Sequence, residues 1–581
     1  MKVVAFRKAA LAGAAGAAAW ELALRAAILA GIPTFDIVKS LGTLAFPAQR
    51  AFAWWPAGMA AHALVGICWA LFYAQFFWAR RNARPALQGL VFAMLPAFLA
   101  FTIMVPQLRL MHLASDDVVL TRELILPQLS PVGIVGLVIG HAIFGLVVGT
   151  LYVRPVGYQN GASRLVVARH RKTVGAGRHE NGSRFMFATG IECSYPTIDH
   201  GRWRRDEMEE TGHYGFWQCD FELARQIGAT HLRYGPPLHL VLTGPGRFRW
   251  DLADEPMAEL EQHGPEPIVD LCHFGLPAWL ENFQNPEIAA ALADYAGAFA
   301  ERYPWVRFYT PINEMYVCAR MSTLDGLWNE QIQDERAFAT AAFNLAEASV
   351  RMADAILARR PDAILIHSES SEFYHACCPD PEIEATAAFE NERRFLPLDL
   401  IFGQEVSQPM LRYLQEHGRE ADYRRFRSRD VPRRSVMGVD YYQWNERLID
   451  QDGRARYLGE LFGWYVIAGQ YWQRYRRPMM HTETNFGDAV EAPRWLWRQW
   501  HNLQLLRSSG VPLIGFTWYS LIDQVDWDIG LASATGTVDP VGLFDLNRDP
   551  RMVGLSYKHL IDMHRDAPGY RECPALQELL R

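Results

Sequence analysis

Four long apolar segments in the first 155 residues restrict what this chain can fold into more than any other feature. They lie at about residues 9–32, 52–79, 86–106 and 131–153. Each reaches the roughly 20 residues that an α-helix needs to cross the hydrocarbon core of a bilayer. A cleaved signal peptide would explain only the first segment, and helices of a soluble bundle would be apolar on one stripe rather than all round. The pattern predicts four transmembrane helices.

The composition changes after about residue 155, where charged and aromatic residues become common. The 581 residues are also too many for one ordinary domain. We predict a transmembrane domain over residues 1–155, a linker rich in Gly, Ser and basic residues over 156–180, and a globular domain over 181–581.

Charge and cysteine content exclude two broad classes of protein. The formal net charge of −7 gives no general basic character, so we expect no nucleic-acid partner. The eight cysteines are scattered and form no CxxC pair, which does not fit a disulfide framework.

The basic residues around the apolar segments predict an orientation. Lys and Arg gather before the first segment, between the second and third, and after the fourth. Such residues favour the cytoplasmic side of a membrane. We therefore expect a multi-pass protein of a bacterial-type inner membrane, with both termini and the globular domain in the cytoplasm.

A few ionisable residues interrupt the apolar segments. Glu21 and Arg25 stand one helical turn apart in the first segment, and His62 and His141 lie within the second and fourth. Intramembrane ionisable groups are functional candidates by default. An internal ion pair with two interhelical hydrogen bonds would account for them, and a haem or lipid-headgroup site is the alternative.

The globular domain alternates β-rich apolar runs with helical stretches. Eight candidate strands cover residues 184–192, 230–236, 267–274, 306–314, 363–370, 435–442, 478–484 and 512–520. Helical patterns cover 211–227, 285–302, 334–359, 405–428, 460–476 and 491–508. Eight strand–helix repeats over about 400 residues favour a (β/α)8 TIM barrel over an open sheet. The overall fold class is α/β, preceded by the α-helical membrane domain.

Polar and aromatic residues stand where the apolar runs end, which in a barrel is the face that carries the chemistry. They are Glu192, Arg233, His273, Asn313, Glu314, His367, Glu369, Tyr441, Tyr442, Glu483 and Trp518. His367 and Glu369 have the spacing of a metal pair but lack an evident third ligand, so no metal is expected. Two carboxylates from different strands, with aromatic faces beside them, are what glycoside cleavage requires.

At this point the sequence resembles family 1 of the glycoside hydrolases, the β-glucosidase group, over most of 184–560. "TPINEM" (310–315) is similar to the acid/base motif TxNEP, and "HTETNFG" (481–487) to the nucleophile motif TENG. The other similar runs are "VDLCHFGLPAWL" (269–280), "GFTWYSLIDQVDW" (515–527), "LRYG" (232–235) and "VDYY" (439–442).

The resemblance implies a retaining mechanism with Glu483 as the nucleophile and Glu314 as the general acid/base. It implies that Arg233 and Tyr442 hold Glu483 ionised and that Asn313 binds the 2-hydroxyl of the sugar. It also implies sugar contacts from His273, Trp518, Asp526 and Trp527. The family's glutamine in SAYQ has no clear counterpart, and Glu192 is our candidate for that role.

Three functions stay open at the level of sequence. The first is a membrane-anchored retaining β-glycosidase, the second a transglycosylase that acts on a lipid-linked sugar with the same carboxylates, and the third a non-catalytic carbohydrate-binding protein. The expected partners are a small-molecule or lipid-linked β-glycoside and membrane lipids, without a cofactor or protein partner. The sugar-reading positions depart from the family pattern at Phe274, Asp526 and Thr484, so glucose is not implied as the substrate.

Overall fold

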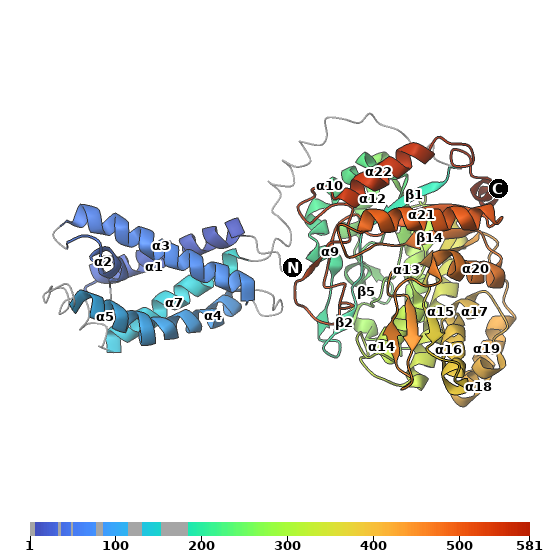
Figure 1. Cartoon of the computed structure of the whole chain (residues 1–581), viewed down its shortest axis with the longest axis horizontal. Helices are drawn as coiled ribbons and strands as arrows, with labels where there is room; N and C mark the ends of the chain where they lie inside the picture. Colours follow the sequence, from blue (N-terminus) through green and yellow to red (C-terminus); the bar gives the residue numbers. More distant parts are fainter. Residues whose placement is uncertain (1–5, 33–35, 48–49, 77–84, 114–130, 153–183) are drawn as a thin grey trace. The chain divides into compact units, whose positions relative to one another are not determined.

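The computed structural model describes residues 6–32, 36–47, 50–76, 85–113, 131–152 and 184–581. The chain divides into two compact units, a helical unit within residues 1–155 and a second unit that contains nearly all of the remainder. The predicted linker, 156–180, lies outside the described residues. Figure 1 shows the helices of the first unit and the mixed strands and helices of the second.

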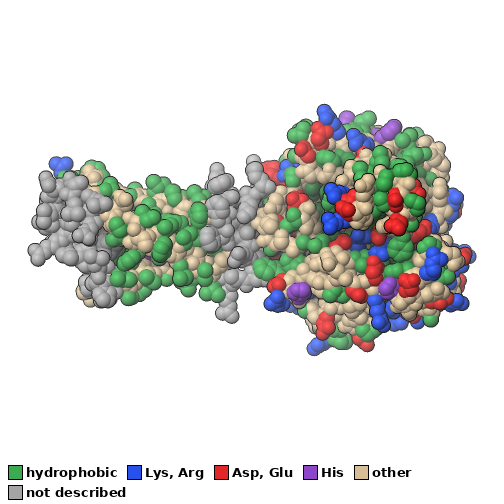
Figure 2. All heavy atoms as spheres, turned by 60° about the horizontal axis from the view of Figure 1, so that its bottom comes forward, with side chains coloured by type: hydrophobic (Ala, Val, Ile, Leu, Met, Phe, Trp, Pro, Cys, Tyr) green, Lys and Arg blue, Asp and Glu red, His purple; other side chains and the backbone are tan. Residues whose placement is uncertain are grey.

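The helical unit contains four helices that are long and apolar enough to cross a membrane, at Lys8–Leu29, Ala51–Ala74, Ala86–Leu108 and Ile134–Leu151. They confirm the four predicted apolar helices. The elements are α1 (Phe6–Leu29), α2 (Ile37–Gly42), α3 (Ala51–Phe76), α4 (Pro85–Leu99), the π-helix η1 (Ala100–Met104), α5 (Val105–Leu113) and α7 (Pro131–Leu151). In Figure 2 the face of this unit is covered mainly by hydrophobic side chains, whereas acidic and basic side chains are spread over the second unit.

The packing order within the helical unit is α3, α1, α7 and α4. Helix α1 packs against α3 and α7, and α7 packs against α4. Gly89 and Gly145 bring α4 and α7 close together, because a Cβ added at Gly89 would lie 2.0 Å from the carbonyl oxygen of Gly145. The predicted pair of Glu21 and Arg25 forms, and Arg25 also donates to Asp36 at 2.8 Å.

The second unit is built on a closed eight-stranded parallel barrel, which confirms the predicted TIM barrel. The strand order around it is β1, β15, β14, β11, β9, β8, β7 and β4. These strands are β1 (Met186–Gly190), β4 (His231–Tyr234), β7 (Glu266–Asp270), β8 (Phe308–Thr310), β9 (Ile364–Ser370), β11 (Ser435–Asp440), β14 (Met479–Glu483) and β15 (Leu513–Trp518). All eight correspond to the predicted runs. All are buried, as expected for a parallel sheet covered by helices.

Helices cover the outside of the barrel. The longer ones are α10 (His213–Gln226), α12 (Asp251–His263), α13 (Ile288–Arg302), α14 (Met315–Thr323), α15 (Glu335–Leu357), α16 (Pro381–Arg393), α18 (Gln408–Glu416), α19 (Glu420–Arg427), α20 (Gly463–Tyr475), α21 (Ala492–Ser508) and α22 (Met552–His564). The single helix predicted over 405–428 is wrong. It divides into α18 and α19 because Gly418 adopts a positive φ of 70° and ends α18.

Short elements fill the connections between strands and helices. The helical ones are α9 (Glu207–Glu210), α11 (Leu238–Val241), η3 (Ala278–Leu280), α17 (Leu396–Ile401) and α23 (Pro574–Leu580). The small sheets pair β2 (Thr197–Ile198) with β3 (Trp203–Arg204), β5 (Leu242–Gly244) with β6 (Arg247–Phe248), and β16 (Gln524–Val525) with β17 (Val538–Asp539). A three-stranded sheet of β10 (Phe373–Ala376), β12 (Glu446–Ile449) and β13 (Ala455–Tyr457) carries residues that line the large cleft described below.

Candidate active site

Two glutamates from different strands meet at the carboxyl end of the barrel. Glu483 is the last residue of β14, and Glu314 lies just beyond β8, directly before α14. Together with Asp440, they place one carboxylate oxygen each within 4.8 Å of the others. A separation of about 5 to 5.5 Å is typical of the carboxyl pair in a retaining glycosidase, whereas inverting enzymes need more room for a water molecule.

Glu483 is held by two donors. The hydroxyl of Tyr442 donates to one oxygen at 2.5 Å, and a terminal nitrogen of Arg233 donates to the other. Burial and the charge of Glu483 raise the pKa of Tyr442 well above its usual value, so this phenol keeps its proton. Hydrogen bonds to the charged form stabilise a carboxylate as an anion, which is the state a nucleophile requires.

Arg233 is itself fixed on several sides. Its second terminal nitrogen donates to Asp270 at 2.9 Å and to the amide oxygen of Asn313 at 2.7 Å. The guanidinium also lies over the ring of Tyr519, 5.2 Å from its centre. Arg233 is buried, and both terminal nitrogens of its planar guanidinium donate hydrogen bonds. It therefore holds Glu483 in one orientation.

Glu314 has the opposite environment. Burial raises its pKa well above the usual value for a glutamate, and the neighbouring charges of Asp440 and Glu483 raise it further. A carboxyl group that keeps its proton near neutral pH is suited to act as a general acid. Its backbone is in the left-handed region, with φ at 43°, which is a strained conformation for a residue other than glycine.

Asp440 is a third carboxylate in the centre of the site, and our sequence reasoning missed it. It is the last residue of β11, and its side chain accepts from the hydroxyl of Ser368 at 2.8 Å. Burial and the charge of Glu483 raise its pKa well above the usual value. The run "VDYY" contains the signal, since it places a carboxylate, Asp440, at the end of an apolar strand and two residues before Tyr442.

The predicted sugar-binding candidates His273, Asn313 and Glu192 lie beside the two glutamates. The ring of His273 uses Nδ1 toward Asp270 at 3.0 Å and Nε2 toward the amide nitrogen of Asn313 at 3.1 Å. Glu192 accepts from Gln524 at 2.9 Å and lies 3.7 Å from Nε2 of His273. The structure therefore brings all three into one connected network.

Trp518 does not lie at the site as predicted. It stands on the same face of β15 as Phe516, whose ring packs against Trp500 of α21 and Tyr557 of α22. Its indole donates to the carbonyl of Val541. Successive side chains on a strand point to opposite faces, so the next residue turns inward.

That next residue is Tyr519, which sequence reasoning also missed. Its ring lies parallel to the ring of His273, with the ring centres 6.3 Å apart, and its hydroxyl donates to the carbonyl of Ile191. It also lies beneath Arg233. Tyr519 thus occupies the position in the site that we had assigned to Trp518.

Asp526 and Trp527 differ in how free they are to bind a sugar. Asp526 is buried and accepts from Arg205 at 3.1 Å. Trp527 lines the large cleft, and its indole N–H has no hydrogen-bond partner among the described residues. Trp527 is therefore the readier donor, whereas Asp526 would have to share its carboxylate with Arg205.

A cleft of about 520 Å³ leads to Glu314 and Tyr442. Its walls combine aromatic and charged side chains, namely Trp328, Trp444, Tyr457, Trp527, Arg320, Asp325, Glu372, Arg447 and Asp528. Because the acid/base candidate lies in its lining while Glu483 does not, the cleft is placed to receive the leaving-group side of a glycoside. Aromatic walls of this kind pack against sugar rings and apolar aglycones alike.

Two groups of side chains have the arrangement of metal ligands. One is Glu314, Asp440 and Glu483, and the other is Cys193, Asp270 and His273. Arg233 donates to a carboxylate of each group, to Glu483 and to Asp270. A guanidinium at this position already supplies the positive charge that a cation would bring, so neither group is a good metal site.

His367 and Glu369 do not form a metal pair. The ring of His367 packs edge-on against Phe402. Glu369 instead accepts from the backbone N–H groups of Tyr316 and Ser370, so it caps the start of α14 next to Glu314.

Comparisons with known proteins agree with this geometry. The family "Glycosyl hydrolase family 1" matches residues 251–453. Beta-glucosidase A of Thermotoga maritima is 23% identical over 363 residues, which cover 56% of this chain and 81% of that protein. The 1,4-beta-D-glucan glucohydrolase of Thermotoga neapolitana is 22% identical over 391 residues, covering 60% of this chain and 86% of that protein.

Solved structures show the same fold. The beta-glucosidase from Thermotoga maritima in complex with glucoimidazole superposes with a TM-score of 0.55 at 18% identity, covering 66% of this chain and 98% of that one. The fold and site thus define a glycoside hydrolase. The barrel is similar to the β-glucosidases of glycoside hydrolase family 1, whose model matches residues 251–453, and that family works with retention.

Proposed function

We propose that this protein is a membrane-anchored β-glycosidase that hydrolyses a β-linked glycoside by double displacement. The observation that carries the proposal is the pair of glutamates with opposite surroundings, in which Glu483 accepts from Arg233 and Tyr442 while Glu314 is buried beside other carboxylates. The four apolar helices support the anchoring.

In the first step of the proposed reaction, Glu483 attacks the anomeric carbon and Glu314 gives its proton to the leaving oxygen. The glycosidic C–O bond breaks as the ester to Glu483 forms. In the second step, Glu314 takes a proton from water, whose oxygen displaces Glu483 and releases the sugar. Asn313, His273 and Glu192 would bind the sugar hydroxyls beside the reacting carbon.

A 2-deoxy-2-fluoro glycosyl fluoride tests the covalent step. Fluoride leaves, the ester to Glu483 forms, and the electron-withdrawing fluorine slows its hydrolysis enough for mass spectrometry. We expect one added sugar on the peptide that carries Glu483, in the full chain and not in the Glu483→Gln variant. Absence of an adduct across glucosyl, galactosyl, mannosyl and xylosyl fluorides would favour the non-catalytic, carbohydrate-binding alternative.

A transglycosylase that uses a lipid-linked sugar is the second candidate. One observation favours it: the cleft beside Glu314 is bordered by the apolar side chains Tyr457, which is 71% exposed, and Leu458, which is 40% exposed. Such a border suits a hydrocarbon aglycone or acceptor. Incubation of an alkyl glycoside with a second, labelled long-chain alcohol distinguishes the two, because a transglycosylase gives the labelled glycoside and a hydrolase gives free sugar.

A further inference from the structure

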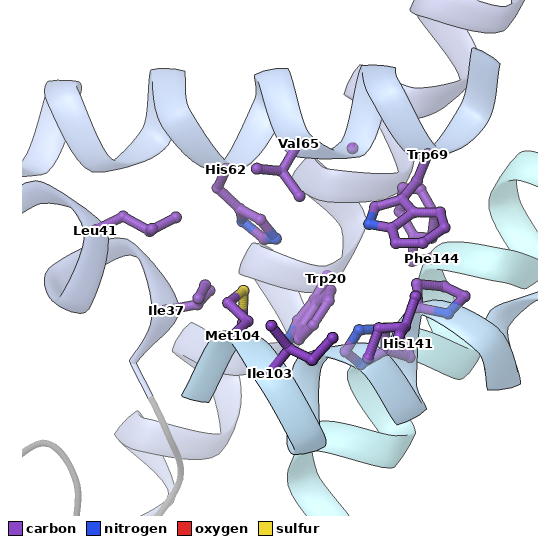
Figure 3. A pocket seen from close by; sticks show the side chains of 14 residues that line it. Trp20, Ile37, Leu41, His62, Val65, Trp69, Ile103, Met104, His141 and Phe144 are labelled. Carbon is purple, nitrogen blue, oxygen red and sulfur yellow. The ribbon is translucent and has the colours of Figure 1, made fainter. Parts of the chain in front are cut away.

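The helical unit encloses a second cavity, separate from the glycosidase site. It has a volume of about 220 Å³, and Figure 3 shows the side chains around it. Its lining comes from α1, α2, α3, α4, η1 and α7 and includes Trp20, His62, Val65, Ile103 and His141.

The ring of His62 is a hydrogen-bonding group without a partner in this cavity. His62 is only 5% exposed, and its Nδ1 has no hydrogen-bond partner among the described residues. In Figure 3 its ring points from α3 into the space between the helices. A polar group buried in this way is costly unless another molecule supplies the missing hydrogen bond.

His141 behaves differently from His62. Its Nδ1 lies 2.9 Å from the carbonyl oxygen of Leu137, one turn earlier in its own helix. The interhelical hydrogen bonds that the sequence suggested are therefore not what holds these two rings. Of the two Nδ1 atoms, the one on His62 is left for a ligand.

The lining excludes two of the ligands that a pair of membrane histidines might suggest. The Trp20 indole packs against both imidazoles, with ring centres 5.1 Å from His62 and 4.5 Å from His141. A haem held by both rings would have to displace it. Among the residues that the structure describes, the lining contains no Lys, Arg, Asp or Glu, so a phosphate headgroup would find no counter-charge there.

Two partly exposed lining residues, Val65 and Ile103, place the cavity at the surface of the unit between α3 and the segment formed by α4 and η1. Helices α3 and α4 meet through Tyr73 and Phe92, whose ring centres are 5.0 Å apart. Beyond this contact the cavity lies between them, bordered by Val65 of α3 and Ile103 of η1. Val65 is 40% exposed and Ile103 is 55% exposed, so in a bilayer the opening faces hydrocarbon chains.

The π-helix supplies one wall of this opening. Residues Ala100–Met104 form η1 directly after α4, and Ala100, Ile103 and Met104 all line the cavity. Single π-helical turns inside α-helices occur frequently at functional sites, because they cost stability that a plain α-helix would keep. Pro96, one turn earlier, lacks a backbone N–H and also faces the cavity.

We propose that this cavity binds a neutral lipid that enters from the bilayer between α3 and η1, with a hydroxyl or carbonyl oxygen at His62 and its hydrocarbon along the apolar lining. Long-chain alcohols, diacylglycerols and isoprenoid quinones share this chemistry. The inference rests on the membrane placement proposed above, which flotation of the full chain with liposomes tests separately.

Photolabelling of the full chain in phosphatidylcholine nanodiscs tests the site. The probe is a long-chain alcohol that carries a diazirine next to its hydroxyl. We expect adducts on the peptides that contain His62 and Ile103. Labelling should fall at least five-fold in Ile103→Trp, which fills the opening, and in His62→Phe, which keeps the ring but removes its nitrogens.

Ile139→Trp on α7 is the matched control for the filling variant. Ile139 is 53% exposed, nearly the same as Ile103, but does not line the cavity, so its labelling should equal that of the wild type. A diazirine alkane of the same length should label the wild type and His62→Phe alike. Unlabelled diacylglycerol, polyprenol and quinone, added as competitors, then show which of the three lipid classes binds best.

Two results would overturn the proposal. One is adducts spread evenly over the lipid-facing positions of all four helices. The other is equal alcohol labelling of the wild type, His62→Phe and Ile103→Trp when the melting temperatures of the three proteins agree.

Discussion

In the barrel, the guanidinium of Arg233 meets Glu483, Asp270 and Asn313, whereas in the helical unit Nδ1 of His62 meets no hydrogen-bonding group among the described residues. Both side chains are buried. Both terminal nitrogens of Arg233 are hydrogen-bonded before substrate arrives, whereas Nδ1 of His62 leaves a hydrogen bond for a ligand to make. Replacing the polar side chain by an apolar one should therefore lower the free energy of unfolding at Arg233, and leave it unchanged or raise it at His62.

The largest effect should come from the proposed nucleophile. Glu483→Gln removes the charge that we propose attacks the anomeric carbon, and we expect kcat/KM to fall by roughly 10³-fold or more. Hydrolysis of a β-aryl glycoside measures it. Glu416→Gln, at an exposed position of α18, is the matched control and should retain wild-type activity; comparable loss in both variants would show that the assay reports on folding rather than on chemistry.

Breaking the network around Arg233 should also cost stability. Arg233→Met removes the guanidinium that the buried carboxylates of Glu483 and Asp270 share, and we expect the free energy of unfolding to fall by about 3–5 kcal/mol. Denaturant unfolding monitored by tryptophan fluorescence measures it. An unchanged unfolding midpoint would mean that the two carboxylates are protonated or hydrated in the folded protein and do not depend on Arg233.

Asp440 should raise the pKa of Glu314, the proposed acid. In its ionised form Asp440 opposes loss of the proton from Glu314, so Asp440→Asn should lower the pKa of Glu314. The alkaline limb of the kcat/KM profile, where the acid loses its proton, should then move to lower pH by roughly one unit. A limb that stays in place, or moves to higher pH, would show that Asp440 does not raise the pKa of Glu314.

The smallest effect is expected in the helical unit. His62→Phe replaces an unpartnered polar ring by an apolar one of similar shape, so the stability of the unit in lipid-free detergent should be unchanged or rise by up to about 1 kcal/mol. Thermal unfolding of the full chain in detergent measures it. A loss like that of Arg233→Met would show that His62 has a structural partner, and would erase the contrast between the two units.

Much of the fold was readable in the sequence because the barrel strands are continuous apolar runs that end in polar residues. "RPMMHTET" places Glu483 at the end of β14, and "RFYTPINE" places Glu314 just after β8. The sequence did not show on which face of its strand each residue lies. Both faces of a parallel barrel strand are buried, so apolar alternation does not distinguish Trp518, which faces the helices, from Tyr519, which faces the site.

Other features depend on contacts that a single sequence does not reveal. Asp440 becomes significant only when β11 brings it beside Glu314 and Glu483. The cavity at His62 depends on how six helical elements pack around it, one of them the π-helix η1, and hydropathy does not reveal this packing. The orientation across the membrane stays a prediction from the basic flanks.

The central claim is that Glu483 is the nucleophile and Glu314 the acid/base. Azide rescue of two variants tests this assignment most directly. In Glu483→Ala, azide should occupy the space of the missing nucleophile and attack the face of the sugar opposite the leaving group, giving an α-glycosyl azide from a β-glycoside with a good leaving group. In Glu314→Ala, azide should attack the glycosyl-enzyme and give the β-glycosyl azide. The reverse pairing of products, determined by NMR, would contradict the assignment of Glu483 as nucleophile and Glu314 as acid/base.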